Sequence, residues 1–334
     1  MEKQPGQRIV QLDYIKAISI LMVVLTHGAF TEAVRERPIF VFLINMAMPL
    51  FMLVYGYVRT VTDRKKRESR RSKAVAWSKK IYNILIPACI AFVIELSLMY
   101  LFNGHLPADL LRLLWEEGGI GPGSYYVPIL LQLLFLYPIL QACFHKNSIL
   151  TTAATVAFFL AFEILAGRFI DDKLYRLLCF RYLPFIVAGM NMAKYRGSLK
   201  KWKNSIFTLS VVSFVWLYLV VYRDYQPRIF SRWTTTAGPV VFWAMSIMIV
   251  FLLYVKPLKG IFGRLVSEIG QSSYYIFLTQ LVWFGVPLRP QSLTGLPAIV
   301  LNWICTVYFG IVFKRIERCI YKKIFTRPKK QTKN

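Results

Sequence analysis

The sequence is short of acidic residues, of histidines and of paired cysteines. Of its 334 residues, 16 are Asp or Glu against 42 Lys or Arg, and three are His. The five cysteines are scattered with no C-x-x-C spacing, so they predict neither a disulfide framework nor a cysteine-based metal site. His105 and His145 fall in or beside loops on opposite sides of the topology derived below, which argues against a three-histidine metal site.

Charge of either sign is also scarce relative to apolar content. Charged residues make up 17% of the chain and hydrophobic residues 56%, with a mean hydropathy of +0.48. The charges gather in short blocks between long apolar runs, and a spanning helix needs ~20 mostly apolar residues. The pattern predicts an all-α polytopic membrane protein of about ten transmembrane helices. The predicted segments are residues 11–30, 39–58, 81–102, 125–144, 149–167, 177–193, 205–222, 236–255, 271–288 and 295–313.

The sixth segment is the weakest, because it is short and carries Arg181. A count of nine spans with a re-entrant piece is therefore the alternative. About three quarters of the cationic residues fall on one side if the N-terminus is cytoplasmic, and the positive-inside rule then places both termini in the cytoplasm. We expect one membrane domain over residues 1–320 and a basic, disordered cytoplasmic tail over residues 321–334.

The net charge of +26 raises the question of nucleic-acid binding. The densest basic block, residues 64–67, lies directly between two apolar segments, where Lys and Arg act as the retention signal of cytoplasmic loops and meet anionic lipid. We therefore expect membrane lipid as a partner and no nucleic acid.

The first apolar segment carries three ionisable residues, Asp13, Lys16 and His27. At 100° per residue all three fall on one face, with His27 about 16 Å of helix rise beyond Lys16. Ionisable groups inside a membrane are costly and usually mark function, and a lone histidine suits a general base acting on a hydroxyl. Two other readings stay open: a snorkelling Asp13–Lys16 pair, and a helix-to-helix hydrogen bond from His27.

A histidine base is usually oriented by a carboxylate, and Asp13 is too far along the helix to do this. Glu163, near the outer end of the fifth segment, is at comparable depth to His27, whereas Glu95 in the third segment is deeper. Both are hypotheses for the orienting group, and we assign Glu163 to the catalytic set with His27, Lys16 and Asp13.

The first segment also resembles a known family. Residues 12–27 read LDYIKAISILMVVLTH, which is similar to the LDxLRAxAxxxVVxxH opening of the acyltransferase-3 family of membrane acyltransferases. Residues 49–57 (PLFMLVYGY) resemble that family's PxFFxxSGY, and residues 79–87 (KKIYNILIP) resemble its KRxxRLLxP. Residues 123–132 (GSYYVPILLQ) and 269–280 (IGQSSYYIFLTQ) resemble two further family segments, in the same order along the chain.

The resemblance implies ten helices and transfer of an acyl group, usually acetyl, from cytoplasmic acyl-CoA to a sugar hydroxyl of an envelope or exported glycan in the bacterial inner membrane. By the same resemblance His27 is the catalytic residue and no metal is needed. Cytoplasmic cations would hold the acyl-CoA donor. Apart from the resemblance, Tyr125 or Tyr126 could bind the substrate by a hydrogen bond to the developing oxyanion, although tyrosines at a membrane interface more often anchor the helix. The cations assigned to the donor are Lys80, Lys79 and Arg59.

The chain departs from the family pattern at four positions. Lys16 stands where the family usually has Arg, and Asn83 replaces a second Arg, so a planar phosphate-binding fork and one charge are lost. Tyr55 replaces Ser, and Gln280 stands in place of a frequent His. The alternative function is a non-catalytic exporter or flippase of a glycan or lipid-linked sugar, because an intramembrane charged face would serve that role as well. A third reading is a non-catalytic membrane subunit.

Overall fold

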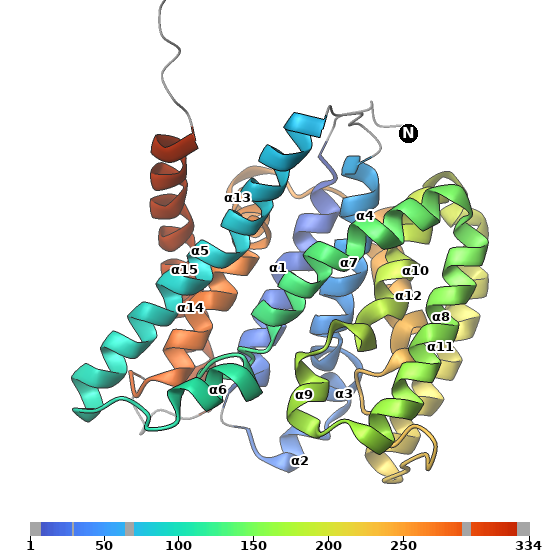
Figure 1. The fold of residues 1–334 in the computed structure, drawn as a ribbon. Coiled ribbons are helices and arrows are strands. Elements are labelled where there is room, and N and C mark those ends of the chain that lie inside the picture. The colour runs from blue at the N-terminus through green and yellow to red at the C-terminus, as the bar shows by residue number, and fades with distance from the viewer. Residues whose placement is uncertain (1–7, 29, 64–69, 289–294, 326–334) are drawn as a thin grey trace, which may run out of the picture.

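The protein is described here from a computed structural model that covers residues 8–28, 30–63, 70–288 and 295–325. Within these ranges it is helical and has no strand, which confirms the all-α prediction. Figure 1 shows the chain running back and forth in one bundle, with the start of α1 and the end of α15 both at the upper end of the view. The basic block at residues 64–67 lies outside the described residues.

Each predicted segment contains a helix. These helices are α1 (Val10–Thr26), α4 (Ala47–Asp63), α5 (Arg70–Asn103), α7 (Tyr126–Lys146), α8 (Ser148–Phe169), α10 (Leu183–Lys194), α11 (Leu199–Tyr222), α12 (Val241–Tyr254), α14 (Ser273–Gly285) and α15 (Gly295–Phe325). Shorter elements join them: α2 (Glu32–Arg35), α3 (Pro38–Phe42), η1 (Ile44–Met46), α6 (Leu110–Glu117), α9 (Asp172–Leu177), η2 (Cys179–Tyr182), η3 (Arg196–Ser198), η4 (Gly238–Val240) and α13 (Gly260–Gln271).

Six helical stretches of the described chain are long and apolar enough to cross a membrane. They are Pro38–Thr62, Trp77–Asn103, Tyr126–Lys146, Ser148–Phe169, Arg196–Tyr222 and Gly295–Lys323. α1, α10, α12 and α14 are shorter, at 17, 12, 14 and 13 residues. The count of ten crossings and the side on which the termini lie stay predictions.

Two predicted segments are interrupted near a proline. The segment 39–58 consists of α3, the 3-10 turn η1 and then α4, and the segment 177–193 begins with η2 before α10. A proline ring clashes with the carbonyl four residues earlier, so a continuous α-helix through Pro49 or Pro184 is disfavoured at that point. At the other end of the chain α15 continues to Phe325, so residues 321–325 of the expected tail are helical. Residues 326–334 lie outside the described residues.

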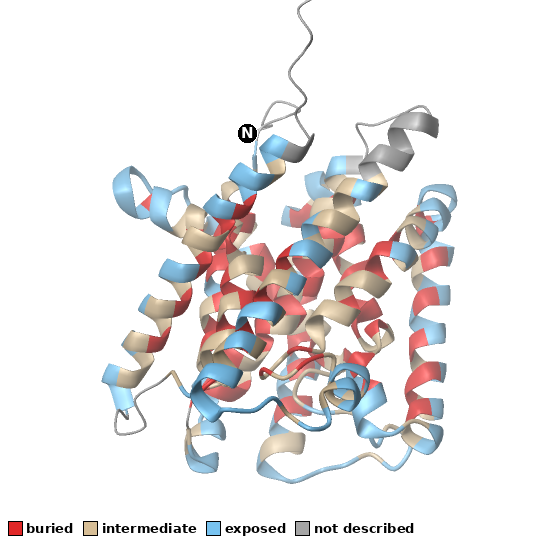
Figure 2. Ribbon diagram, turned by 60° about the vertical axis from the view of Figure 1, so that its left-hand side comes forward, coloured by how far each residue is buried: buried red, intermediate tan, exposed pale blue. Residues whose placement is uncertain are grey.

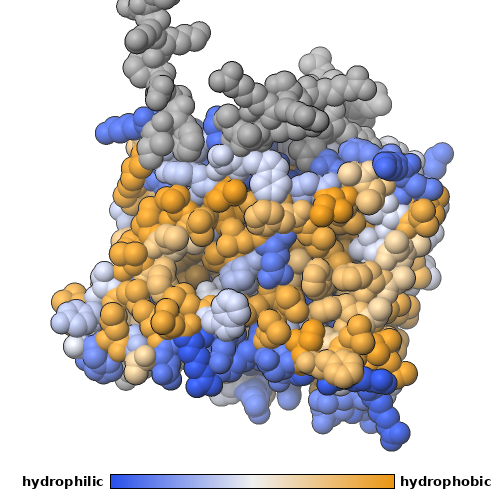
Figure 3. All heavy atoms as spheres, in the orientation of Figure 1, coloured by the Kyte–Doolittle hydropathy of each residue, from blue (hydrophilic) through white to orange (hydrophobic). Residues whose placement is uncertain are grey.

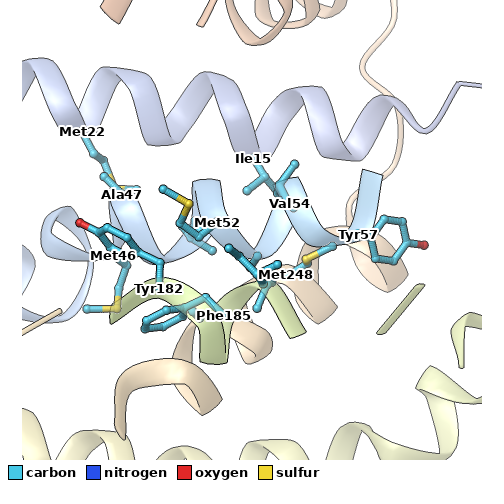
Figure 4. Close-up of a cluster of buried hydrophobic side chains, with 14 of the residues drawn as sticks. Ile15, Met22, Met46, Ala47, Met52, Val54, Tyr57, Tyr182, Phe185 and Met248 are labelled. Carbon is cyan, nitrogen blue, oxygen red and sulfur yellow. The ribbon is translucent and has the colours of Figure 1, made fainter. Parts of the chain in front are cut away.

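The core is formed where α4 crosses α1, α10 and α12. Figure 4 shows large apolar side chains from these helices meeting, among them Ile15 and Met22 of α1, Phe185 of α10 and Met248 of α12. The backbones of α4 and α10 touch: a Cβ on Gly56 would come within 2.1 Å of the Ile186 carbonyl oxygen. Small residues that let helices approach closely are the usual means of packing in a membrane, where apolar burial gives little drive.

The outer faces of the bundle are apolar as well. Figure 2 shows buried residues concentrated along the helices' inward faces, with exposed residues on the outward faces. Exposed side chains on the outer helices include Leu101, Phe135, Val211 and Ile304, and Figure 3 shows an apolar belt between hydrophilic ends. Such a belt fits the hydrocarbon layer of a bilayer, and its outward side chains have lipid as their solvent.

Candidate functional site

The charged residues at the start of α1 form a compact ion-pair group. The buried carboxylate of Asp13 accepts a hydrogen bond from Arg8 Nε at 2.6 Å and pairs with Lys16 Nζ at 2.9 Å. The backbone of Asp13 packs on α13, where a Cβ on Gly270 would lie 1.9 Å from the Asp13 carbonyl oxygen. The ion pair left open by the sequence is therefore present, and it sits at a tight contact between helices.

A cavity of about 250 Å³ opens beside Lys16, between α1, α4, α7 and α14. Its cations are Lys16 and Arg59, and its walls are otherwise mostly apolar or aromatic. Figure 3 shows a hydrophilic patch interrupting the apolar belt over the region between α5 and α7. We name the cavity beside Lys16 the α1 cavity. It is lined by Lys16, Val23, Met48, Phe51, Val54, Tyr55, Val58, Arg59, Tyr126, Leu130, Ser273, Tyr274 and Phe277.

His27 follows α1 directly and faces protein. Its ring centre is 6.2 Å from that of Phe284 on α14. A Cβ placed on Gly123 would meet His27 Nε2 at 3.4 Å and the Phe277 ring at 3.6 Å. Phe277 also lines the α1 cavity, so the Gly123 position adjoins both His27 and a ring of the cavity wall.

A glycine-rich loop, residues 118–124, holds this arrangement from the lower end of the bundle. Gly123 has φ of +93°, a conformation that glycine adopts without strain. A Cβ on Gly121 would lie 2.5 Å from the Leu281 carbonyl oxygen, so the loop backbone presses against α14. Ser124 Oγ donates to the Glu117 carbonyl at 2.9 Å. The glycine density of this stretch is a sequence signal for a close backbone approach.

Two buried polar side chains contact the same loop. Gln280 Nε2 donates to the Pro122 carbonyl at 3.1 Å and lies 3.7 Å from the position of a Cβ on Gly123. Glu95 Oε1 would be 2.9 Å from a Cβ on Gly121 and 2.2 Å from one on Gly285. Within the described chain, Oε1 of each residue has no hydrogen-bond partner, which is uncommon for buried oxygens and usually has a reason. The departure noted at Gln280 thus lies beside His27.

Of the three cations predicted to hold a donor, Arg59 is the one that lines the α1 cavity. Its guanidinium carbon lies 5.4 Å from the centre of the Tyr55 ring, so the tyrosine that replaces the family's serine forms part of the same wall. Lys79 and Lys80 lie partly buried on α5, which contributes no residue to the lining.

The two predicted substrate tyrosines face different parts of the molecule. Tyr126 lines the α1 cavity and packs edge-on against Phe277, with ring centres 4.9 Å apart. Tyr125 lies under the guanidinium of Arg181, 5.8 Å from its ring centre to the guanidinium carbon. Tyr126 is therefore the closer of the two to the His27 region by its contacts.

Glu163 lies on α8 at a second cavity, of about 410 Å³. The Tyr175 hydroxyl of α9 donates to both of its carboxylate oxygens, at 3.1 and 2.9 Å. Glu163 does not line the α1 cavity, whereas Glu95 packs against the glycine-rich loop, which also lies next to His27. We name the second space the α9 cavity; it is lined by Phe159, Glu163, Asp172, Tyr175, Arg176, Arg181, Ser231, Arg232, Thr234, Thr236 and Ala237.

Comparison with known proteins gives one match. A family model described as "Acyltransferase domain" matches residues 9–315, from the residue before α1 into α15. The matched stretch includes both cavities, the glycine-rich loop and His27. No curated protein and no solved structure matches the chain.

Proposed function

The chain belongs to the acyltransferase-3 family and is a multi-pass membrane acyltransferase, and from that premise we propose that it transfers an acyl group from cytoplasmic acyl-CoA to a hydroxyl of an envelope or exported glycan. Acetyl is the acyl group used in the test below. The observation that carries the proposal is the course of the α1 cavity. Its lining includes the cations Lys16 and Arg59 and also Phe277, whose ring lies next to Gly123, the residue that also adjoins His27.

The shape and lining of the α1 cavity fit the donor. Lys16 and Arg59 supply positive charge for the phosphates of coenzyme A at the end where α1 begins. Beyond them the wall of the cavity is mostly apolar. The cavity's volume of about 250 Å³ accommodates the narrow thioester arm rather than the nucleotide. Lysine holds a phosphate as a point charge without the bidentate fork of arginine, so Arg59 is the stronger of the two contacts. Lys79 and Lys80 of α5 add positive charge near the same end of the bundle.

His27 acts as the general base in this proposal. The thioester supplies the acyl carbonyl carbon, and coenzyme A leaves as its thiol. His27 accepts the proton of the acceptor hydroxyl while that oxygen bonds to the carbonyl carbon, and then returns the proton to the departing sulfur. Proton transfer of this kind contributes ~10²–10⁴ in rate.

The surrounding residues position the base and exclude water. Gln280 holds the glycine-rich loop through Pro122, and Glu95 packs its carboxylate against that loop at Gly121. We assign both as positioning residues because their contacts reach His27 through the loop. Tyr126 borders the cavity and has a hydroxyl that can donate to the developing oxyanion. Asp13 orients Lys16.

The test is acyl transfer by the purified full-length protein in detergent, with labelled acetyl-CoA and a preparation of envelope polysaccharide as acceptor. We expect a product heavier by one acetyl group per modified sugar, read by mass spectrometry, and a loss of at least ~10²-fold in rate for His27→Ala. His105→Ala, at an exposed histidine, is the matched control and should keep the wild-type rate. A non-catalytic exporter would give no acylated product with either protein, which would end the proposal.

A further inference from the structure

Arg181 is a cation enclosed by aromatic rings. Its guanidinium carbon lies 5.8 Å from the ring centre of Tyr125, 5.5 Å from that of Tyr175 and 4.6 Å from that of Tyr182. One of its terminal nitrogens donates to the Tyr182 hydroxyl. Among the ion pairs of the described chain none involves Arg181. It is partly exposed, and it lines the α9 cavity.

This arrangement leaves a positive charge without an anion. Arginine does not lose its proton in proteins, so Arg181 cannot avoid the cost of leaving water by becoming neutral. Tyrosine faces offset part of that cost, but a cation–π contact is worth less than a hydrogen-bonded anion. An anionic group in the α9 cavity would give the guanidinium the partner that the described chain lacks.

The cavity offers further donors for such a group. Arg232 is fixed by Asp172 and by the Ile170 carbonyl, yet its buried Nε has no partner in the described part of the protein. Arg176 is exposed at the same cavity. Asp172 is already paired with Arg232, and Glu163, which accepts from Tyr175, forms no ion pair with Arg181 or Arg176 among the described residues. Three arginines against two carboxylates leave the lining with one positive charge in excess.

The remaining walls suit a sugar ring. Ser231, Thr234 and Thr236 carry hydroxyls that can donate or accept, and Glu163 can accept from sugar hydroxyls. Phe159 adds an apolar surface next to these polar groups. The combination of hydroxyls, one carboxylate, an aromatic face and uncommitted cations fits a saccharide that carries a negative charge better than it fits a neutral one.

The α9 cavity is also adjacent to the proposed catalytic region. Tyr125, on which Arg181 stacks, follows Gly123 by two residues, which is about 7 Å of chain at most. Gly123 is the residue whose Cβ position lies 3.4 Å from His27 Nε2. The chain segment that contacts Arg181 is therefore continuous with the segment that lies next to His27.

We propose that the α9 cavity binds the anionic group of the acceptor, a phosphate or carboxylate on a saccharide, with Arg181 as its main contact and Arg176 and Arg232 beside it. The proposal rests on the proposed acyl transfer for its purpose, but the binding itself requires neither donor nor chemistry. It assigns to the acceptor a negative charge that the family match leaves open.

The experiment is equilibrium binding to the purified full-length protein in detergent, without acyl-CoA. Glucose 1-phosphate, glucuronate and glucose are the matched probes, and inorganic phosphate shows whether the sugar contributes. We expect at least one charged sugar to bind ~10-fold or more tightly than glucose, with the preferred one identifying phosphate or carboxylate as the recognised group. Arg181→Gln should lose ~10-fold in affinity for that charged sugar and nothing for glucose.

The matched control is Arg112→Gln, because Arg112 is an exposed arginine of α6 that does not line the cavity. It should bind all probes as the wild type does. If Arg181→Gln does not fold, Arg176→Gln decides, since that side chain is exposed and its loss should weaken charged-sugar binding by ~3-fold. Equal affinity for glucose and both charged sugars, or an equal loss in Arg112→Gln, overturns the proposal.

Failure of this proposal and of the acyl transfer would be distinguishable. His27→Ala should abolish transfer and leave charged-sugar binding unchanged. Transfer to a neutral glycan with no charged-sugar preference would keep the enzyme and remove the anion site. Charged-sugar binding without transfer would keep the site and remove the enzyme.

Discussion

The two cavities differ in the chemistry of their linings, and therefore in the ligand that each would bind. The α1 cavity has cations at one end and then a mostly apolar wall, whereas the α9 cavity mixes three arginines, two carboxylates and four hydroxyl side chains. The first suits a long molecule with a charged head and an apolar arm. The second suits a compact molecule that is polar on all sides. The difference supports giving the donor to the α1 cavity and the acceptor to the α9 cavity.

The glycine-rich loop lies between these two environments. It contacts His27 and Phe277 through Gly123, and it continues directly into Tyr125 below Arg181. A substitution in one cavity should therefore leave binding of the other cavity's ligand unaffected. A substitution in the loop should affect turnover without affecting the binding of either ligand.

Among the predictions that compare the two cavities, the largest expected effect is on kcat, and it distinguishes the buried carboxylate Glu95 from the buried carboxylate Glu163. Glu95→Gln removes a charge that packs against the loop at Gly121, and we expect kcat to fall ~10-fold or more with little change in the KM of acetyl-CoA. Glu163→Gln, in the α9 cavity, should instead raise the acceptor KM and keep kcat near the wild-type value. Steady-state kinetics on both substrates measures this. If Glu163→Gln lowers kcat as much as Glu95→Gln does, the two carboxylates have been assigned the wrong way round.

The next effect tests the donor side. Arg59→Gln removes a cation of the α1 cavity, so the KM of acetyl-CoA should rise by ~10-fold while glucose 1-phosphate binds as before. Raising the salt concentration should narrow the gap between variant and wild type, because the interaction is between charges. Arg176→Gln serves as the opposite control, with donor KM unchanged. A donor KM that does not move in Arg59→Gln would take the coenzyme out of the α1 cavity.

A smaller effect concerns the scaffold of the α9 cavity. Gln132 of α7 donates to the Leu177 carbonyl at 2.7 Å and accepts from the Cys179 N–H at 2.9 Å, which ties α9 and η2 to the bundle. Gln132→Leu leaves both groups unpaired and should cost about 1–3 kcal/mol, seen as a lower melting temperature in detergent. Charged-sugar binding should weaken, with the donor KM unchanged. Gln141→Leu, at a partly buried glutamine of the same helix whose side chain pairs with the exposed His145, should melt like the wild type.

The smallest effect lies at the surface near the α9 cavity. Hydrogen bonds from Lys173 and from Arg112 lower the pKa of Glu116 below its ordinary value, and the bond from Lys173 links α6 to α9. Because the folded-state pKa is depressed, this contribution is present above the unfolded pKa and is lost as the pH falls through the folded one. Hydrogen exchange at α9 should therefore become slightly faster under acidic conditions, and Glu116→Gln should remove that dependence. An unchanged pH dependence in the variant would assign it to another group.

Much of the fold was predictable because lipid imposes a simple rule on helix length and polarity. Each apolar segment named from the sequence contains a helix, and the all-α prediction is confirmed. The sequence rules did not locate the breaks before Pro49 and Pro184, although proline chemistry gives their physical reason. The family membership predicted from the first helix is confirmed over residues 9–315.

The candidate site was only partly predictable, because position along a helix does not say which helices are neighbours. Depth alone favoured Glu163 as the partner of His27, but the structure pairs Glu163 with Tyr175 and brings Glu95 to the loop beside His27. Arg181 counted only as a weakness of the sixth segment, since the sequence does not show that Tyr125, from a distant stretch, joins the nearby Tyr175 and Tyr182 around it. The catalytic roles stay predictions.

The aromatic pair of Tyr126 and Phe277, packed edge-on in the wall of the α1 cavity, bears on how a membrane could tolerate such an enzyme. A continuous water-filled passage would let protons and ions leak across the bilayer. Two rings packed edge to face in the cavity wall would leave room for a group of a few atoms while keeping bulk water out of the bundle.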